Sequence, residues 1–222
     1  MERNIRLSIF GISHDLRTPL TSLTGYLQLL SKEQDSGKRR EYLEVISRSA
    51  EVLRDLTENF YELSRLELGE TTFTPQSLNL ERVVCEGFLN FFENFSQKGI
   101  EVEIRETGTA MIALADPVAL NRILSNLAQN QLRCACGTVT VAFASEHGSA
   151  SVTISNESSA PLPPDPERLF ERFYTADSSR SNRGSGLGLY VSRKLAEGMA
   201  GSLAARFDEG WIALILQLLA TR

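Results

Sequence analysis

The stretch ISHDLRTPLTSLTGYLQLL, residues 12–30, sets the pattern for the first part of the chain. Its apolar residues recur at steps of three or four, which is typical of the narrow seam of a helical bundle or coiled coil. The complete seam consists of Ile5, Ile9, Ile12, Leu16, Leu20, Leu23, Leu27 and Leu30. The spacing therefore predicts a long amphipathic helix that ends near residue 30.

A second seam follows a polar break at residues 34–37. It consists of Tyr42, Ile46, Ser49, Leu53, Leu56, Phe60, Leu63 and Leu66. Gly69 suits the position just after a helix end. Two helices with one narrow seam each bury little apolar surface, so we expect a hairpin that forms a homodimer through residues 5–66, a four-helix bundle. The alternative is a hairpin packed against the rest of its own chain.

His14 in the first predicted helix is a candidate nucleophile. It lies two residues, or about 200° around a helix, from the seam positions on either side, so it should point away from the seam. Asp15 could fix the tautomer of the imidazole, and Thr18 shares its helix face. Pro19 cannot donate to the carbonyl of Asp15, which predicts a local bend. The alternative is an ordinary surface histidine.

From residue 76 onward the sequence alternates predicted helices and strands, which is typical of an α/β domain. Asp116 and Pro117 suit the N-cap and the first turn of a helix. The predicted helices are 78–97, the one opened by Asp116, and 187–199; the predicted strands are 100–105, 110–115, 137–145, 149–155, 202–207 and 211–219. Residues 70–75 form the predicted linker.

Two motifs in this second region suit the binding of a polyphosphate. The hexamer Gly184-Ser185-Gly186-Leu187-Gly188-Leu189 opens the last predicted helix, where glycines and the helix N-terminus favour negative charge. A structural turn is the alternative. Asn126 and Asn130 lie one helical turn apart and offer neutral oxygen ligands to Mg²⁺, although helix packing would also explain them.

Composition limits the classes of function. The chain has 222 residues, a formal net charge of −5 and 42% hydrophobic residues, which fits one large or two small domains with a buried core. The mildly acidic balance argues against general nucleic-acid binding. Three cysteines and two histidines without ligand spacing argue against a disulfide scaffold or a zinc site, and free thiols favour a reducing cytosol.

The order of these motifs along the chain resembles the order of the conserved boxes in the sensor histidine kinases of two-component systems. Residues 13–20 are similar to their H-box, Asn126 and Asn130 to the N-box, residues 169–174 to the F-box and residues 184–189 to the G2-box. The resemblance covers about residues 5–220. It implies an α+β chain in which a helical hairpin, residues 1–69, serves for dimerisation and histidine phosphotransfer. A hinge linker, residues 70–75, then leads to an α/β sandwich of the GHKL ATPase type, residues 76–222.

The resemblance also implies a role for each motif residue. His14 is the phospho-acceptor, Asp15 takes its proton, and Thr18 orients a water for phosphatase activity on a response regulator. Asn130 is the Mg²⁺ ligand. The residues implied to bind ATP are Asn126, Asn130, Arg133, Asn156, Phe170, Phe173, Gly184, Gly186 and Gly188.

The sequence departs from the family at two motifs. The N-box usually reads Asn-Ala-x-Lys/Arg-Tyr, but Gln131 replaces the small residue and Cys134 the aromatic one. The G1 box, usually Asp-x-Gly-x-Gly, has lost both glycines, and Asn156 stands where the family has Asp. Its amide oxygen can still accept a hydrogen bond from adenine, but without the charge we expect adenine binding to weaken by about 1–2 kcal/mol.

Three functions follow from these features. The first is a kinase core that autophosphorylates His14 from Mg-ATP and passes the phosphoryl group to an Asp of a response-regulator receiver domain, with phosphatase activity as well. The second is a degenerate kinase with weak nucleotide binding that acts mainly as a phosphatase or dimeric scaffold. The third is a GHKL ATPase of another kind, against which the H-box argues. We expect a cytoplasmic protein or the cytosolic part of a membrane-anchored sensor.

Overall fold

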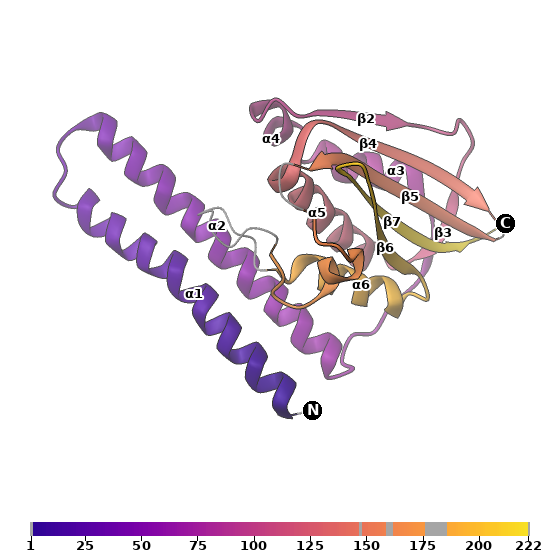
Figure 1. The fold of residues 1–222 in the computed structure, drawn as a ribbon, viewed down its shortest axis with the longest axis horizontal. Coiled ribbons are helices and arrows are strands. Elements are labelled where there is room, and N and C mark those ends of the chain that lie inside the picture. The colour runs from indigo at the N-terminus through magenta and orange to yellow at the C-terminus, as the bar shows by residue number, and fades with distance from the viewer. Residues whose placement is uncertain (1, 147, 159–161, 176–185, 222) are drawn as a thin grey trace. The chain divides into compact units, whose positions relative to one another are not determined.

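A computed structural model describes residues 2–146, 148–158, 162–175 and 186–221; for residues 2–15 it describes the helical backbone and not the side chains. The chain forms two compact units, the helical unit Met1–Arg65 and the sheet unit Leu66–Arg222 (Figure 1). None of the described helices is long and apolar enough to cross a bilayer.

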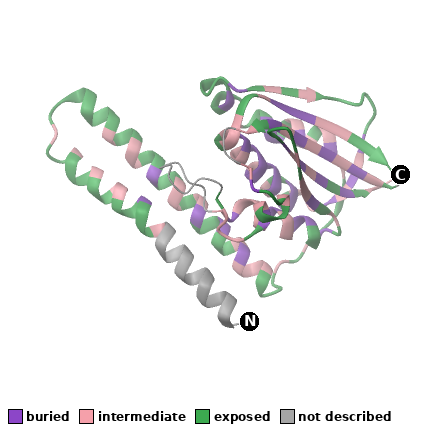
Figure 2. Ribbon diagram, viewed as in Figure 1, coloured by how far each residue is buried: buried purple, intermediate pink, exposed green. Residues whose placement is uncertain are grey.

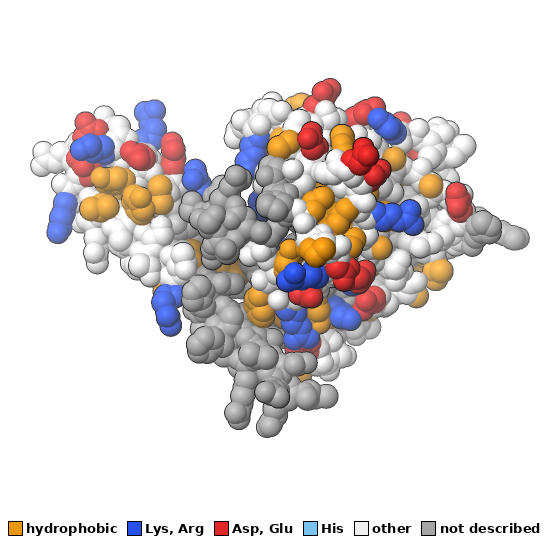
Figure 3. All heavy atoms as spheres, viewed as in Figure 1, with side chains coloured by type: hydrophobic (Ala, Val, Ile, Leu, Met, Phe, Trp, Pro, Cys, Tyr) orange, Lys and Arg blue, Asp and Glu red, His pale blue; other side chains and the backbone are white. Residues whose placement is uncertain are grey.

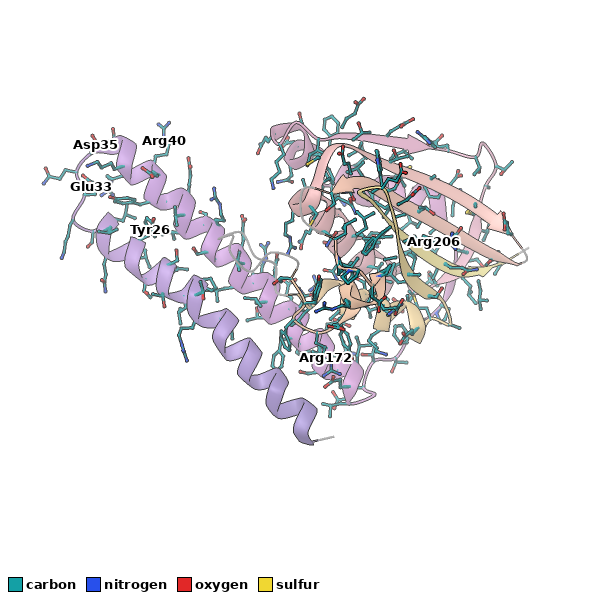
Figure 4. The ribbon with its side chains drawn as sticks, in the orientation of Figure 1. Tyr26, Glu33, Asp35, Arg40, Arg172 and Arg206 are labelled. Atoms are coloured by element: carbon teal, nitrogen blue, oxygen red, sulfur yellow. The ribbon has the colours of Figure 1, made fainter. Side chains whose placement is uncertain are left out.

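The helical unit is a hairpin of two long helices, which confirms both helices predicted from the seams. Helix α1 spans Glu2–Leu30 and continues through Pro19, and helix α2 spans Ser36–Glu67. At the turn, Asp35 Oδ1 accepts a hydrogen bond from the Lys38 N–H at 2.9 Å and so caps α2 (Figure 4).

The two helices meet along one set of heptad positions. The hydroxyls of Ser22 and Ser49 lie 3.3 Å apart, and the rings of Tyr26 and Tyr42 have centroids 5.5 Å apart. Leu56, seven residues after Ser49, is also buried. A seven-residue interval returns to the same side of a packed helix, so these residues form the inner seam of the hairpin.

A second set of heptad positions stays at the surface. Leu20 and Leu27 are 52% and 46% exposed, whereas Leu16, Leu23 and Leu30 are more covered. Figure 3 shows hydrophobic side chains at the surface of the hairpin. The single hairpin therefore leaves part of its apolar seam in contact with water.

The sheet unit is a two-layer α/β structure with a seven-stranded sheet. The sheet order is β1-β3-β7-β5-β4-β2, and β6 also pairs with β7; β2 and β4 pair in parallel, and in the described part of the chain the other pairs of these strands are antiparallel. The strands are β1 Gln76–Asn79, β2 Glu101–Arg105, β3 Ile112–Ala115, β4 Ala135–Glu146, β5 Ser149–Ser158, β6 Ser202–Asp208 and β7 Trp211–Ala220. The helices are α3 Leu80–Leu89, α4 Phe92–Gln97, α5 Pro117–Cys134, the 3-10 helix η1 Pro166–Phe170 and α6 Gly188–Gly198.

The core lies between the sheet and its helices (Figure 2). Alternate residues of the central strands are buried, as the period of two of a strand requires. They are Ala150, Val152, Ile154 and Asn156 on β5 and Ile212, Leu214, Leu216 and Leu218 on β7. Asn156 is thus the one polar residue in this inward-facing set.

One element predicted from sequence was wrong. Residues 78–97 form the end of β1 and two short helices, not one helix. Leu78 and Asn79 pair with β3, and the Asn79 side chain accepts the Arg82 N–H at 3.1 Å and caps α3. The pairing with β3 lies more than thirty residues away in sequence, and local periodicity does not reveal it. The other predicted helices and strands are confirmed, with ends shifted by a few residues.

The predicted linker, residues 70–75, is partly anchored to the sheet unit. The Thr74 N–H donates to Asp116 Oδ2 at 2.8 Å. The Phe73 ring lies against Gly198, where a Cβ would come within 2.4 Å of it. A hinge in this linker stays a prediction, and these contacts would restrict it to the residues before Phe73.

Candidate functional site

Asn126 of α5 is buried and connects this helix to the start of α6. Its Nδ2 donates to the Gly188 carbonyl at 3.2 Å and to Ser192 Oγ at 3.1 Å. Because the amide nitrogen is used in this way, a role toward phosphate or metal would fall to the side-chain oxygen. Asn130, one turn later, is half-buried. The structure therefore supports packing as one role of Asn126.

The C-terminal turn of α5 carries the other N-box residues. Arg133 is exposed, and its guanidinium donates to the carbonyl and side-chain oxygens of Gln129 at 3.2 and 3.1 Å. Burial raises the pKa of the Cys134 thiol, although nearby Arg133 and Lys98 act in the opposite direction. Cys134 therefore stays a neutral thiol near pH 7 and offers no negative charge to repel phosphate.

The G2-box and F-box meet at Gly186. The Phe173 N–H donates to the Gly186 carbonyl at 3.0 Å. Gly186 has φ +62°, and a Cβ there would lie 2.5 Å from the carbonyl carbon of Phe173. Only glycine allows this approach. Gly184, another predicted phosphate-binding glycine of the G2-box, lies in residues 176–185, outside the described residues.

Phe170, the first F-box aromatic, is anchored by Arg193 of α6. Phe170 is buried, and the Arg193 guanidinium lies 4.0 Å from its ring centroid. Arg193 also donates to both carboxylate oxygens of Glu167 at 2.7 and 3.0 Å and to the Leu203 carbonyl at 3.0 Å. The hydrogen bonds from Arg193 hold the pKa of Glu167 below its usual value. The F-box is thus fixed to α6 and β6.

Arg172 is a second anchor that sequence reasoning missed. Arg172, labelled in Figure 4, donates to the Tyr190 hydroxyl at 2.7 Å, stacks over that ring at 4.7 Å and pairs with Glu67, which also belongs to the sheet unit. Arg172 lies within the F-box, residues 169–174, but its partners come from distant segments. Arg193 was missed for the same reason.

Asn156 of β5 is fully buried at the inner face of the sheet. Its Nδ2 donates to the Glu157 carbonyl at 2.7 Å. Among the described residues, its Oδ1 has no hydrogen-bond partner. The amide is therefore oriented with its acceptor available, which suits a ligand that donates an N–H.

The predicted phospho-acceptor residues are less fully described. His14 and Asp15 lie within the helical backbone of α1, and their side chains lie outside the described residues. Thr18, one turn further, is exposed. The predicted orientation of His14 away from the seam stays a prediction.

A helical hairpin followed by an α/β unit with these motifs defines the class of histidine kinase catalytic cores. Residues 9–69 match the family described as His Kinase A (phospho-acceptor) domain. Residues 115–215 match the family described as histidine kinase-, DNA gyrase B- and HSP90-like ATPase. The two matches identify the chain as a histidine kinase catalytic core, a phospho-acceptor domain followed by an ATPase domain, and they confirm the family and the fold class predicted from sequence.

Named relatives agree with this assignment. The sensor histidine kinase YcbM of Bacillus subtilis (strain 168) is 26% identical over 211 residues, which cover 92% of this chain and 68% of the relative. The chain spans only 24–56% of the length of three further curated sensor proteins.

Solved structures share the fold. The histidine kinase AdeS of Acinetobacter baumannii has a TM-score of 0.76 and 20% identity over 94% of this chain and 98% of its own. Histidine kinase ThkA in complex with the response regulator protein TrrA has a TM-score of 0.72 and 20% identity over 99% of this chain and 64% of its own.

Proposed function

We propose that this chain is a kinase core that autophosphorylates His14 from Mg-ATP and passes the phosphoryl group to an Asp of a response-regulator receiver domain. The single observation that carries the proposal is the presence of a phospho-acceptor match, residues 9–69, and an ATPase match, residues 115–215, in one chain. The phosphorelay would operate in the cytosol, on a signal from a membrane-anchored sensor.

The residues of the sheet unit fit a magnesium-bound adenine nucleotide. The buried Asn156 Oδ1, which has no hydrogen-bond partner in the part of the chain that the structure describes, is an acceptor for the amino group of adenine. Helix α6 begins at Gly188 with no side-chain cap hydrogen bond, and the N–H groups and dipole at a helix N-terminus favour phosphate. Asn130 would hold Mg²⁺, with Asn126, Arg133 and Gly184 beside the phosphates; Phe170 and Phe173 would anchor the segment that covers them. Bound Mg²⁺ would neutralise charge on the phosphate oxygens.

His14 would act as the nucleophile. One imidazole nitrogen forms a bond to the γ-phosphorus of ATP, the bond from that phosphorus to the β–γ bridging oxygen breaks, and ADP leaves with the electron pair. The ring proton passes to the Asp15 carboxylate. In the second step the Asp15 carboxyl returns the proton to the ring, and the phosphorus–nitrogen bond breaks as a receiver Asp carboxylate forms its own bond to phosphorus, which restores the neutral imidazole.

The exposed heptad leucines of the hairpin support a homodimer. Leu20 and Leu27 continue the seam but remain about half exposed, and a second hairpin would cover them in a four-helix bundle. The ThkA structure, a complex with a response regulator, supports a receiver domain as the second partner.

Phosphatase activity is a further part of the proposal. Thr18 is exposed one turn after His14 and could orient a water toward the phospho-aspartate of a bound receiver. The altered G1 and N boxes favour a second candidate, a degenerate kinase that binds nucleotide weakly and acts mainly as a phosphatase or dimeric scaffold.

Labelled ATP with Mg²⁺ tests these candidates on the full chain. We expect an acid-labile, base-stable label that is lost in His14→Gln and kept in His147→Gln, because His147 is the only other histidine. Label that survives His14→Gln contradicts the proposed phospho-acceptor. Nucleotide binding without any label favours the degenerate kinase, and ATP turnover that is insensitive to His14→Gln favours another kind of ATPase.

A further inference from the structure

Gln131 of α5 carries a side-chain amide in the core of the sheet unit. Its side chain is fully buried, and among the described residues neither its Oε1 nor its Nε2 has a hydrogen bond. Buried polar groups in proteins are nearly always paired, so both atoms need an explanation. The other buried side-chain atoms without partners in the described chain are Asn156 Oδ1 and the hydroxyls of Thr71 and Thr221.

The backbone brings Gln131 close to Asn156. The Gln131 carbonyl accepts the N–H of Ala135, the first residue of β4. Ala135 is paired with Ser158 of β5, two residues beyond Asn156, and Val139 is paired with Asn156 itself. The C-terminal turn of α5 and the end of β5 are therefore neighbours.

Both side chains face the layer between the helices and the sheet. Asn156 belongs to the buried, inward-facing residues of β5. Gln131 lies seven residues after Leu124 and four after Leu127, on the buried face of α5. Three unpaired amide atoms, two acceptors and one donor, therefore gather in one part of the core.

This set of groups is complementary to the amino edge of adenine. That edge offers two N–H donors on N6 and a ring-nitrogen acceptor on either side of them, N1 and N7, and a glutamine amide can contact one donor and one acceptor at once. Asn156 would accept one N6 hydrogen, Gln131 Oε1 would accept the other, and Gln131 Nε2 would donate to the ring nitrogen. Guanine presents an acceptor, O6, in place of the amino group. Asn156 would meet O6 with its own acceptor, because the hydrogen bond from its Nδ2 to the Glu157 carbonyl holds the amide in this orientation.

We propose that Gln131 is a specificity-determining residue that, together with Asn156, selects adenine by its 6-amino group. This inference rests on the proposed function, because it requires nucleotide binding in the sheet unit. This role explains why a glutamine occupies a position where an apolar side chain would make the ligand-free protein more stable.

Binding of two nucleotides to the full chain tests the inference: ATP, and purine riboside triphosphate, which lacks the 6-amino group. The variant is Gln131→Met, nearly isosteric and unbranched; the matched control is Gln97→Met on the exposed surface of α4. We expect the preference of the wild type for ATP over the purine analogue to fall about 5-fold in Gln131→Met, the effect of one neutral hydrogen bond. Gln97→Met should keep the full preference.

Thermal melting without nucleotide, followed by the fluorescence of the single tryptophan Trp211 in the sheet unit, checks that Gln131→Met folds. We expect a melting temperature equal to or above that of the wild type. A folded variant that keeps the wild-type preference for ATP overturns the inference and leaves the proposed function intact. A ligand-free melting temperature clearly below the wild type overturns it as well, because Gln131 would then be a structural residue. A wild-type chain that binds neither nucleotide overturns the proposed function, and this inference with it.

Discussion

The helical unit and the sheet unit are incomplete in opposite ways. The hairpin leaves apolar side chains at its surface, with Leu20 and Leu27 about half exposed along a seam. The sheet unit buries its core leucines but also encloses polar atoms of Gln131 and Asn156 that have no partner among the described residues. Another protein surface can cover exposed apolar side chains, whereas a polar ligand can supply the hydrogen bonds that a buried amide lacks.

This contrast indicates what each unit needs to complete it. The seam repeats every seven residues, so its complement is a second copy with the same repeat. The amides lie at single positions inside the core, so their complement is a small planar molecule with matching donors and acceptors. The proposed division of labour, dimerisation in one unit and nucleotide binding in the other, follows from this difference.

The largest effect is expected from breaking the apolar seam. Leu20→Glu combined with Leu27→Glu should convert the dimer into a monomer. A two-fold dimer covers the exposed halves of four such leucines; full burial of a leucine contributes about 1.5–3 kcal/mol, so each of these contributes about half of that. Light scattering coupled to size-exclusion chromatography measures the change in mass.

Leu29→Glu is the matched control for this prediction. Leu29 is 50% exposed, much like Leu27, but it lies two residues away, about 200° around the helix. We expect this variant to remain dimeric. A monomeric Leu29→Glu, or a double variant that stays dimeric, would contradict the assignment of the seam.

A smaller effect is expected where the sheet unit joins its F-box to its G2-box. Gly186→Ala places a Cβ against the backbone of Phe173 at positive φ, which should cost about 1–3 kcal/mol of unfolding free energy. In Gly188→Ala the new Cβ would lie 3.6 Å from Asn126, an ordinary contact, so its stability should change by less than about 0.5 kcal/mol. Urea unfolding followed by Trp211 fluorescence measures both; equal stabilities would contradict the close contact.

Sequence reasoning predicted the elements whose signals are local. The hairpin could be predicted because apolar residues repeat along each of its helices. Helix α5 could be predicted because Asp116 and Pro117 are typical of a helix start. The prediction of one helix over residues 78–97 was wrong because β1 forms by pairing with β3. The Asn79 side chain caps α3, but it marks the boundary between strand and helix only when that pairing is known. Elements formed by non-local pairing are the ones that periodicity misses.

The site residues also divide into those with a local sequence signal and those without one. Asn126, Asn156 and Gly186 could be selected because they lie in short motifs of fixed order. Arg193 could not, because its partners Glu167, Phe170 and Leu203 come from separate segments. The sequence shows an unusual residue at Gln131, but it could not show that the amide has no hydrogen-bond partner among the residues that the structure describes.

The smallest predicted loss of stability concerns an aspartate N-cap, which each of the two units contains. Asp116 accepts hydrogen bonds from Val118 and Ala119 at 2.9 and 3.0 Å and also from Thr74, and Asp116→Ala should lower the stability of the sheet unit by about 1 kcal/mol. Asp116→Asn should lose less, because the amide oxygen can still accept. Asp35→Asn, which alters the cap of α2, should leave the Trp211 unfolding transition unchanged.

The charge of this cap makes its contribution depend on pH. Burial by itself would raise the pKa of Asp116, but the backbone N–H groups of Ala119, Thr74 and Val118 outweigh it and hold the pKa below its ordinary value of 3.8. A carboxyl whose pKa falls on folding stabilises the protein above its unfolded pKa and loses that stabilisation as the pH falls through the folded value. The stability advantage of the wild type over Asp116→Asn should therefore be full at pH 6 and shrink as the pH falls below 3.8. Urea titrations followed by Trp211 fluorescence across this range measure the advantage, and a constant difference would show that the charge of the Asp116 cap has no part in holding α5.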